Sequence, residues 1–451
     1  MRSIYTGPMA RQSVSGQKIA IVGAGVSGLT CAFYLAEQNE VTVYEANAYL
    51  GGHTDTHELL DDGRAVTVDS GFIVFNEYNY TGFTRLLNAL GVESEPSDMS
   101  FSVVNEGSGL EYGAAGLARL FAQKRNLLSP RFYRMLRDIV RFYREAPRLL
   151  DDAVIPEKAE LSLGDYLERE RYSQDFIENH ILPMASALWS ASSQSILAFP
   201  ARYFVAFMNN HQMLNLTTRP EWRVVKGGSS AYVKALRAQC RATFHCNSKV
   251  ASVSRQDDET LRVRRADGSV EIFDQVIFAC HSDQALDCLE APSQAEREVL
   301  GAIRYQPNQA MVHTDVSVLP ARRSAWSSWN VRIDKSSEHD CRVSYWMNLL
   351  QNIRSDTQFI VSLNMADRID PSKILAERHY SHPIYDAGTI AAQRRRGDIN
   401  GSDGIWYAGA YWGWGFHEDG VRSALDVIDG LAHQQSSRPE SRKVEFGIHA
   451  A

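Results

Sequence analysis

The chain has 451 residues, 44% of them apolar and 22% charged, with a formal net charge of −7 from 47 basic and 54 acidic residues. This composition is close to average globular usage, so it excludes a disordered, collagen-like or coiled-coil architecture. The modest charge gives no global nucleic-acid footprint. Six cysteines without CxxC spacing argue against a disulfide framework or a zinc site, and they fit a reducing compartment.

The N-terminal segment is polar, and it precedes the first strong structural signal. It lacks the apolar core of a signal peptide, and no run of about 18 apolar residues follows anywhere in the chain. We therefore expect a polar leader over residues 1–17 and a cytoplasmic protein without a transmembrane helix.

A complete dinucleotide-binding unit follows the leader. Residues 18–22 form a β-branched apolar run typical of a buried strand, residues 29–38 are helical in pattern, and residues 41–44 form a second strand. Glu45 ends that strand, 20 positions after the central glycine of the turn between strand and helix. Strand, turn, helix, strand and acid occur in the order that binds a dinucleotide, with the pyrophosphate on the helix start and the ribose hydroxyls on Glu45. The turn supplies Gly23, Gly25, Val26, Ser27 and Gly28.

The unit alone does not separate FAD from NAD, but the next segment helps. Glu45 is followed by Ala46 and then by Gly51, Gly52, His53 and Thr54. Here the sequence resembles the flavin-dependent amine oxidase and carotenoid desaturase superfamily, which places a Gly-Gly-Arg or Gly-Gly-His segment against its cofactor after the acid. The resemblance implies FAD. Because no second dinucleotide fingerprint appears in the chain, we expect no dedicated NAD(P)H domain, and NAD at this single site is the competing interpretation.

Further matches follow in the superfamily's order. Residues 68–73 resemble the strand that brings backbone near the flavin ring, and residues 225–229 resemble the return into the cofactor domain. Residues 249–253 resemble the strand whose valine meets the adenine, and residues 276–280 resemble the strand that closes the cofactor sheet. The resemblance thereby adds to the expected cofactor-binding residues Gly71, Phe72, Ile73, Val250 and Ala279.

The last motif lies near the end of the chain. Residues 405–408 read as a short buried strand, and a glycine-rich aromatic turn leads to a helix with apolar spacing from Val421 to about residue 432. The resemblance makes Gly409, Phe416, His417 and Val421 cofactor-binding. The aromatic side chains predict the wall of a substrate cavity, and an aromatic core under a loop is the alternative. The substrate residues expected from this turn are Tyr411, Trp412 and Trp414.

His417 is the catalytic candidate, because an imidazole beside a flavin can orient a substrate or take a proton. A structural partnership with Glu418 or Asp419 is the other interpretation. No cysteine lies in the aromatic segment, so we expect FAD to be bound non-covalently, and no metal-binding motif appears.

Two inserted segments separate the cofactor pieces. The first is mostly helical in pattern, and the second alternates like the strands of an antiparallel sheet. The expected fold class is α/β: a Rossmann-type FAD-binding domain interleaved with an α+β substrate domain, as in amine oxidases. The expected boundaries place residues 18–84, 216–300 and 400–435 in the cofactor domain, residues 85–215 and 301–399 in the substrate domain, and residues 436–451 in a tail.

A strongly basic stretch occurs within the first insertion. It carries a local charge of +7, from nine basic residues against Asp138 and Glu145: Arg119, Lys124, Arg125, Arg131, Arg134, Arg137, Arg141, Arg144 and Arg148. Within it, residues 132, 136, 139, 140 and 143 form an apolar stripe. The pattern predicts contact with an anionic membrane surface or an acidic acyl carrier, which would make the protein peripheral to a membrane. A solvated helix face is the alternative.

Three strings point to a narrower resemblance, to bacterial FAD/NAD-binding, amine-oxidase-like proteins associated with cyclopropane-fatty-acyl-phospholipid synthases. They are residues 69–77, 97–101 and 415–420. This resemblance implies an FAD-dependent oxidoreductase that oxidises or desaturates a small hydrophobic substrate, a modified fatty acyl chain, by hydride transfer to flavin. The alternatives are an amine oxidase, a redox-neutral flavin-dependent isomerase and a flavin-binding scaffold.

Overall fold

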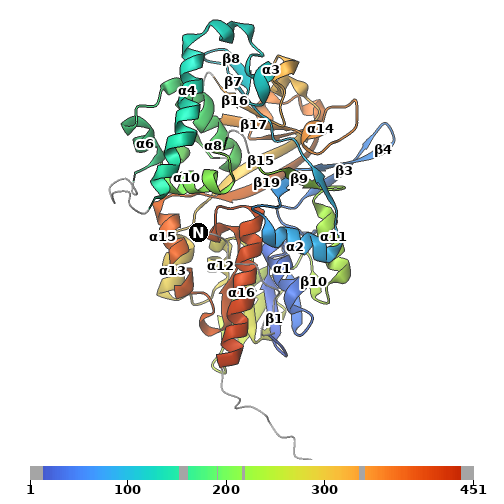
Figure 1. Ribbon diagram of the computed structural model, residues 1–451. Helices are drawn as coiled ribbons and strands as arrows, with labels where there is room; N and C mark the ends of the chain where they lie inside the picture. Colours follow the sequence, from blue (N-terminus) through green and yellow to red (C-terminus); the bar gives the residue numbers. More distant parts are fainter. Residues whose placement is uncertain (1–13, 152–160, 190, 216–218, 335–340, 438–451) are drawn as a thin grey trace, which may run out of the picture.

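The computed structural model describes residues 14–151, 161–189, 191–215, 219–334 and 341–437. A parallel sheet forms the lower half of the molecule in Figure 1, and a larger mixed sheet with a helical layer forms the upper half. The tail beyond residue 437 and the leader up to residue 13 lie outside the described residues. Val14, which we expected within the leader, is instead buried in the core of the lower half.

The parallel sheet is assembled from three distant parts of the chain. Its order is β10-β2-β1-β14-β20, and every neighbouring pair is parallel. The strands are β1 (Lys18–Val22), β2 (Glu40–Tyr44), β10 (Thr243–His245), β14 (Gln275–Phe278) and β20 (Ile405–Tyr407). The segment expected to close this sheet, β14, lies inside it between β1 and β20. The C-terminal strand β20 takes the edge beside β14.

Helices cover one face of the parallel sheet (Figure 1), and a small antiparallel sheet with three further helices covers the other. The first face carries α1 (Val26–Leu35), α2 (Thr81–Leu90), α11 (Ser230–Gln239) and α16 (His417–Ser437). The second face carries β11 (Val250–Arg255), β12 (Leu261–Arg265), β13 (Val270–Phe273), α12 (Ser282–Cys288), α13 (Gln294–Gly301) and α15 (Ala387–Arg394). The expected boundary at residues 84/85 falls inside α2, whose buried face packs entirely into the lower core.

The upper sheet has the order β19-β15-β18-β17-β16-β7-β8. All its pairs are antiparallel except β16 with β7. Its strands are β7 (Phe101–Asn105), β8 (Leu110–Gly113), β15 (Tyr305–His313), β16 (Trp329–Ile333), β17 (Cys341–Trp346), β18 (Ile360–Leu363) and β19 (Ile374–Pro383). The first insertion is therefore not purely helical, because it contributes β7 and β8.

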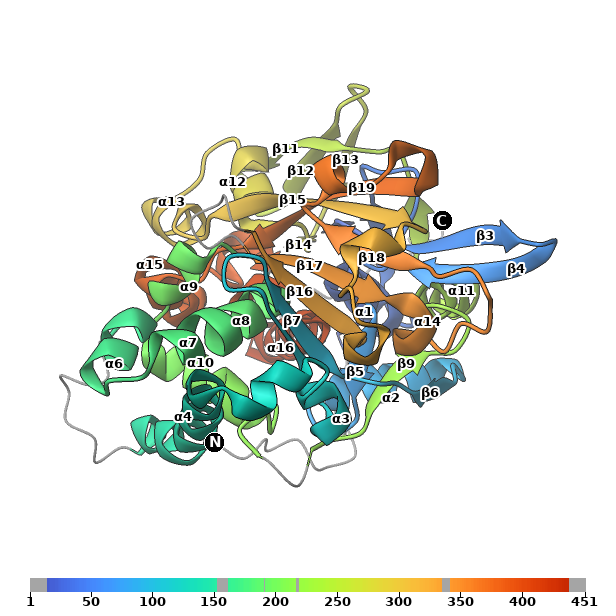
Figure 2. The same cartoon turned by 90° about the horizontal axis from the view of Figure 1, so that it is seen from above.

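A layer of helices packs against this sheet, and Figure 2 shows it gathered along one side of the molecule. It comprises α3 (Gly116–Leu120), α4 (Pro130–Glu145), α6 (Leu163–Arg169), α7 (Gln174–Phe176), α8 (Leu182–Trp189), α9 (Ser193–Leu197) and α10 (Ala201–Asn210). Of the apolar stripe predicted for α4, Phe132 and Tyr143 are buried, whereas Val140 is exposed. Among the described residues, no helix is long and apolar enough to cross a membrane.

Smaller elements join the two halves. A hairpin of β3 (Thr56–Asp61) and β4 (Arg64–Asp69) projects from the side of the molecule (Figure 2), and β5 (Val74–Asn76), β6 (Ser94–Pro96) and β9 (Trp222–Val225) form a three-stranded sheet. Asp69, the last residue of β4, connects the hairpin to α11 and to the segment after α14. Its carboxylate accepts the backbone N–H of Ser229 at the start of α11 and the side-chain amide of Gln351, which follows α14 (Met347–Leu350).

Candidate functional site

The glycine turn between β1 and α1 leaves an open helix start. Gly23 adopts a φ of +104° and donates its N–H to the Tyr44 carbonyl, which bends the chain sharply after β1. A Cβ at Gly28 would lie 2.0 Å from the Gly23 carbonyl oxygen, so only glycine permits this packing. At Gly25 an added Cβ would meet no described atom within 4 Å, and no side chain caps α1. Uncapped N–H groups facing open space fit a pyrophosphate.

Glu45 lies at the end of β2, beside this turn. The side chain is buried, and its two oxygens accept the N–H groups of Ala24 at 2.9 Å and Asn47 at 2.8 Å. Each carboxylate oxygen retains a further lone pair, which can accept a ribose hydroxyl. The Glu45 carbonyl accepts the N–H of Ser248, two residues before Val250. The structure therefore brings Glu45, Ala46 and the first residue of β11 to one end of the sheet.

The second glycine pair packs against the first turn. The Gly51 N–H donates to the Ala24 carbonyl, and a Cβ at Gly52 would lie 3.1 Å from the Gly25 Cα. The next residue, His53, accepts the Phe72 N–H with its carbonyl at 2.7 Å, so the segments 51–54 and 71–73 run side by side. The His53 Nε2 atom is buried and has no hydrogen-bond partner among the described residues. A buried polar atom of this kind fits a ligand that bears hydroxyl or phosphate groups.

His417 begins α16 and is enclosed on all sides. Its ring stacks on Phe72 with centroids 3.6 Å apart and planes 9° from parallel. Its Nε2 lies 2.9 Å from the Tyr232 hydroxyl and 3.3 Å from the Thr54 hydroxyl. Burial lowers the pKa of His417 to about 3, helped by the nearby His53, so the ring is neutral at physiological pH.

The alternative interpretation, in which His417 pairs with Glu418 or Asp419, is wrong. Glu418 instead accepts the Gly82 and Phe83 N–H groups at the start of α2, and Asp419 accepts the Trp414 and Phe416 N–H groups within the turn. The sequence reasoning missed Tyr232, whose place on the buried face of α11 carries no distinctive signal of its own.

Three further imidazoles gather between β14 and the upper sheet. The His53 ring lies 6.1 Å from that of His281 and 5.4 Å from that of His382, and it stacks on Tyr380 at 4.9 Å. His382 in turn bonds to the Asn308 side chain at 2.9 Å. Burial lowers the pKa of His53 and His281 to about 4 and that of His382 to about 3, so this cluster is also uncharged. The sequence reasoning singled out His53 but not the other residues of this cluster, because the cluster is assembled from four separate segments of the chain.

The start of α16 crosses the start of α1. The Ser27 hydroxyl donates to the Gly420 carbonyl at 3.0 Å, and a Cβ at Gly420 would lie 2.6 Å from a Val26 methyl group. The Gly409 N–H donates to the Ser423 hydroxyl, and Val421 is buried in the same core. The N-terminal and C-terminal motifs thus meet at one place, and Ala279 lies against Gly23 and Gly28 there.

The aromatic turn divides between two clusters. Tyr411 and Trp412 pack on the face of the parallel sheet that carries α12 and α13. Trp414 and Phe416 instead pack into the helical layer: the Phe416 ring stacks on Phe207 at 4.9 Å, and the Trp414 carbonyl accepts the indole N–H of Trp189 at 3.2 Å. Trp414 thus lies in a different cluster from Tyr411 and Trp412, and the contact of these three residues with a substrate stays a prediction. A Cβ at Gly413, between the two pairs, would overlap the Asp419 side chain.

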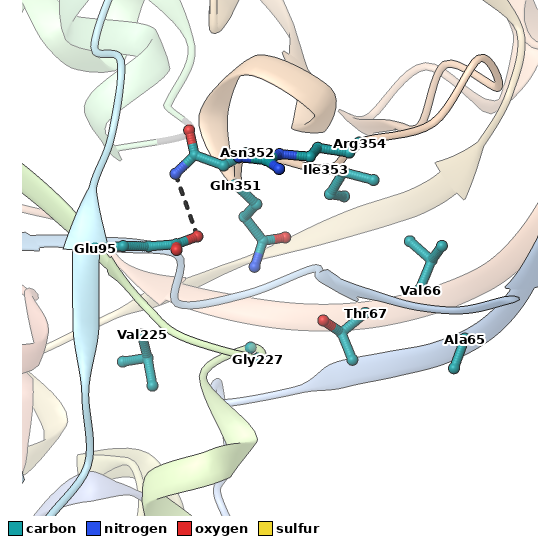
Figure 3. A pocket seen from close by; sticks show the side chains of 11 residues that line it. Ala65, Val66, Thr67, Glu95, Val225, Gly227, Gln351, Asn352, Ile353 and Arg354 are labelled. Atoms are coloured by element: carbon teal, nitrogen blue, oxygen red, sulfur yellow. Dashed lines mark hydrogen bonds between the residues drawn. The ribbon is translucent and has the colours of Figure 1, made fainter.

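A cavity of about 210 Å³ lies elsewhere, between β4, the Gly227–Gly228 turn and the segment after α14. Figure 3 shows its polar rim, where the Asn352 amide donates to Glu95 at 3.2 Å. The adjoining start of α11 is already occupied, since Asp69 and the Thr56 hydroxyl accept the N–H groups of Ser229 and Ser230. None of the expected cofactor-binding residues lines this cavity.

Comparison with known proteins agrees with this geometry. Residues 26–328, which are 303 of 451, match the model of the family described as flavin containing amine oxidoreductase. No curated protein matches the chain.

Solved structures share the fold at low identity. The CLA-producing fatty acid isomerase from P. acnes has a TM-score of 0.67 and 15% identity, covering 92% of this chain and 99% of that one. The cyclohexylamine oxidase from Brevibacterium oxydans has a TM-score of 0.64 and 15% identity, covering 93% and 99%. A putrescine oxidase bound to putrescine has a TM-score of 0.64 and 15% identity, covering 94% and 99%. The expected amine-oxidase-like α/β fold is confirmed.

Proposed function

The chain belongs to the flavin containing amine oxidoreductase family and is an FAD-dependent oxidoreductase, and from that premise we propose that it oxidises or desaturates a modified fatty acyl chain. FAD, when bound, supplies a hydride acceptor at flavin N5. The protein's task is then to hold the cofactor, to present a C–H bond of the substrate to it and to exclude water.

Residues of three segments would hold the cofactor. The uncapped start of α1 at Gly25 would receive the pyrophosphate, and Glu45 would accept the ribose hydroxyls. Thr54 and His417, already linked through the Tyr232 hydroxyl, form a rigid neutral wall beside Phe72. Because the His417 ring is uncharged and its Nε2 is engaged by two hydroxyls, its expected role is to orient rather than to take a proton.

The single observation that carries the substrate proposal is the aromatic cluster at the C-terminal turn. Trp414 and Phe416 lie among Trp189, Phe207 and Tyr203, all of them carried by the helical layer or by the turn. The carboxylate of Asp419, beside this turn, accepts two backbone N–H groups and so does not present a free charge for an ammonium group. An apolar wall without a free anion suits an acyl chain better than an amine.

An isomerase is the second candidate, because a fatty acid isomerase shares the fold over nearly the whole chain. An amine oxidase is the third, since the fold is also that of the cyclohexylamine and putrescine oxidases. These likenesses concern the fold, so an experiment must choose among the three activities.

The deciding measurement is an anaerobic titration of the holoprotein with detergent-dispersed fatty acyl lipids and, separately, with simple amines. We expect acyl lipids carrying a methyl or cyclopropane modification to bleach the visible flavin absorbance and amines to leave it unchanged. Bleaching by amines alone would overturn the proposal. A rearranged lipid product with the oxidised spectrum unchanged would assign the isomerase instead.

A matched pair of variants locates the substrate. Trp414→Phe should raise the KM for the lipid by about tenfold, because a buried aromatic contact is lost. Trp412→Phe makes the same substitution at a tryptophan of the other cluster, and its KM for the lipid should stay within about twofold of the unmodified protein's. If both substitutions raised the KM equally, Trp412 would also contact the substrate.

A further inference from the structure

Exposed apolar side chains concentrate on the outside of the helical layer. Of the twelve large apolar side chains exposed among the described residues, five lie within residues 117–140. Leu128 is 89% exposed and Leu117 is 75% exposed, and Leu127, Tyr133 and Val140 are each close to half exposed. A single exposed leucine needs no explanation, but a contiguous group of them marks an interaction surface.

These side chains form one surface. Phe121, just after α3, packs on Phe132 and lies 6.4 Å from the Tyr133 ring, and the Tyr133 hydroxyl donates to the Leu127 carbonyl at 3.1 Å. Figures 1 and 2 both place α3 and α4 on the same side of the molecule, with the 3₁₀ turn Lys124–Leu128 linking them. We name this surface, carried by α3, the turn and the outer face of α4, the basic–apolar patch.

Arginines interleave with the apolar side chains on α4. Tyr133, Arg137, Val140 and Arg144 follow one another at spacings of four, three and four residues, so they share the outward helix face. The side chains of Arg137 and Arg144 are 73% and 72% exposed, although each has an acidic neighbour in the chain. Arg134 lies beside this stripe and forms no ion pair with any residue that the structure describes.

The patch keeps a net positive charge in the folded protein, although Arg119 forms an ion pair with Asp98 at 3.9 Å. Lys124 and Arg125 likewise form no ion pair within the described part of the chain, and neither does Arg148 just beyond the end of α4. The acid in the middle of α4, Asp138, is buried, accepts the Ser173 N–H and lies within 4 Å of Arg137 and Arg141. Arg131 donates from two nitrogens to the carboxylate of Asp175, so its charge is compensated and the patch depends on the other basic side chains. The surface therefore attracts anions.

We propose that the basic–apolar patch docks the protein on the surface of an anionic lipid bilayer. Lysine and arginine meet the lipid phosphates, and the leucines of the turn insert at the level of the upper acyl chains. Charge complementarity alone would also suit an acidic acyl carrier protein. The largely exposed leucines favour a bilayer, because insertion removes the apolar side chains of Leu117 and Leu128 from water.

The position of the patch fits the proposed substrate. The inner face of α4 contributes Phe132, Met135 and Phe142 to the same apolar cluster that receives Trp414 and Phe416 from the C-terminal turn. One layer of helices thus faces the bilayer on its outside and the aromatic wall on its inside. Docking is nevertheless inferred from the surface itself, and it can be tested without turnover.

The test is co-sedimentation of the holoprotein with phosphatidylcholine vesicles, with and without phosphatidylglycerol. We expect binding to the anionic vesicles only, with most of it lost at about 0.5 M salt, where the Debye length falls below 5 Å. Arg134→Glu should lower the partition coefficient by about tenfold and Leu128→Ser by about fivefold.

Matched controls lie on other surfaces. Arg354→Glu reverses an exposed arginine beside the polar cavity, and Leu60→Ser changes a leucine that is 82% exposed on β3. Neither control should change binding by more than about twofold, and flavin content and melting temperature should be the same in all four variants. Equal binding to neutral vesicles, or equal losses in patch and control variants, would overturn the proposal. Capture of an acidic carrier protein without any vesicle binding would overturn it as well, and would reassign the patch to a protein partner.

Discussion

The residues of the glycine turn show how chemistry and packing divide between neighbouring positions. Gly28 is required by the fold, because its missing side chain lets α1 approach the Gly23 carbonyl. Gly25 is not required by any described contact, and its φ of −71° is open to every amino acid. A glycine that the fold does not need, at an open helix start, is explained by a ligand that approaches the backbone closely.

This difference predicts opposite phenotypes for two alanine substitutions. Gly25→Ala should change the free energy of unfolding of the FAD-free protein by less than about 1 kcal/mol and weaken FAD binding by at least about tenfold, because the methyl group enters the cofactor space. Gly28→Ala should lower the free energy of unfolding by about 2–4 kcal/mol through overpacking. Denaturant unfolding and FAD titration of the two apoproteins measure both effects. Unchanged FAD affinity in Gly25→Ala would remove this turn from the site.

At the scale of elements, α16 organises the site from the far end of the chain. Its first turn supplies His417 to the wall around Phe72, Glu418 to the start of α2, and Asp419 to the aromatic turn. Sequence periodicity predicts this helix from Val421, but the structure begins it four residues earlier, at His417. Glu418 and Asp419 extend the helix because their negative charges interact favourably with the positive N-terminal end of its dipole. The same carboxylates accept backbone N–H groups of α2 and of the aromatic turn.

The link between α16 and α2 can be tested at Glu418. Burial raises the pKa of its carboxyl to about 7, opposed by the N–H groups of Phe83 and Gly82. Glu418→Gln keeps the shape but places an amide N–H₂ where one N–H group of α2 now donates, so the free energy of unfolding should fall by about 1–2 kcal/mol. Glu77→Gln, a change at a carboxylate that is 62% exposed, is the control and should cost less than about 0.5 kcal/mol. Equal stability of both variants would show that α2 does not depend on this cap.

Across the whole molecule, seven of the described histidines are wholly or partly buried and uncharged at neutral pH. Burial lowers the pKa to about 3 or 4 for His53, His180, His211, His281, His313, His382 and His417. Burial also raises the pKa to about 6 for Asp69 and Asp419 and to about 7 for Glu418. The two groups have opposite effects on stability as the pH changes.

The sign of the net effect follows from proton counts. Between pH 6.5 and about 4 the unfolded chain binds protons on these seven histidines that the folded protein does not bind, so stability falls with decreasing pH. Over the upper part of that range the folded protein binds protons on the three carboxylates that the unfolded chain does not bind. This difference offsets part of the lost stability. We expect the free energy of unfolding to fall by about 8 kcal/mol from pH 7 to pH 5, because the seven histidines contribute a loss of about 13 kcal/mol and the three carboxylates offset about 5 kcal/mol of it.

Denaturant titrations of the FAD-free protein at pH 7, 6 and 5 measure this slope. Asp419→Asn removes one of the offsetting protons and should make the decline steeper. A stability that is flat or rises toward pH 5 would mean that the imidazoles are protonated in the folded state.

Sequence alone determined the dinucleotide unit, because its signals are local: glycine conformations, a β-branched strand, a helical period and an acid at a fixed distance all lie within residues 18–45. It also indicated that one fold interleaves distant segments. Which side chains meet was decided only by the tertiary structure. The contact of Thr54 with His417 spans 363 residues, and the neighbouring rings of Trp412 and Trp414 enter different cores. Val140 faces outward although it belongs to the apolar stripe predicted for its helix. Side-chain direction in a turn or at a helix edge depends on what packs against it, and no local pattern carries that information.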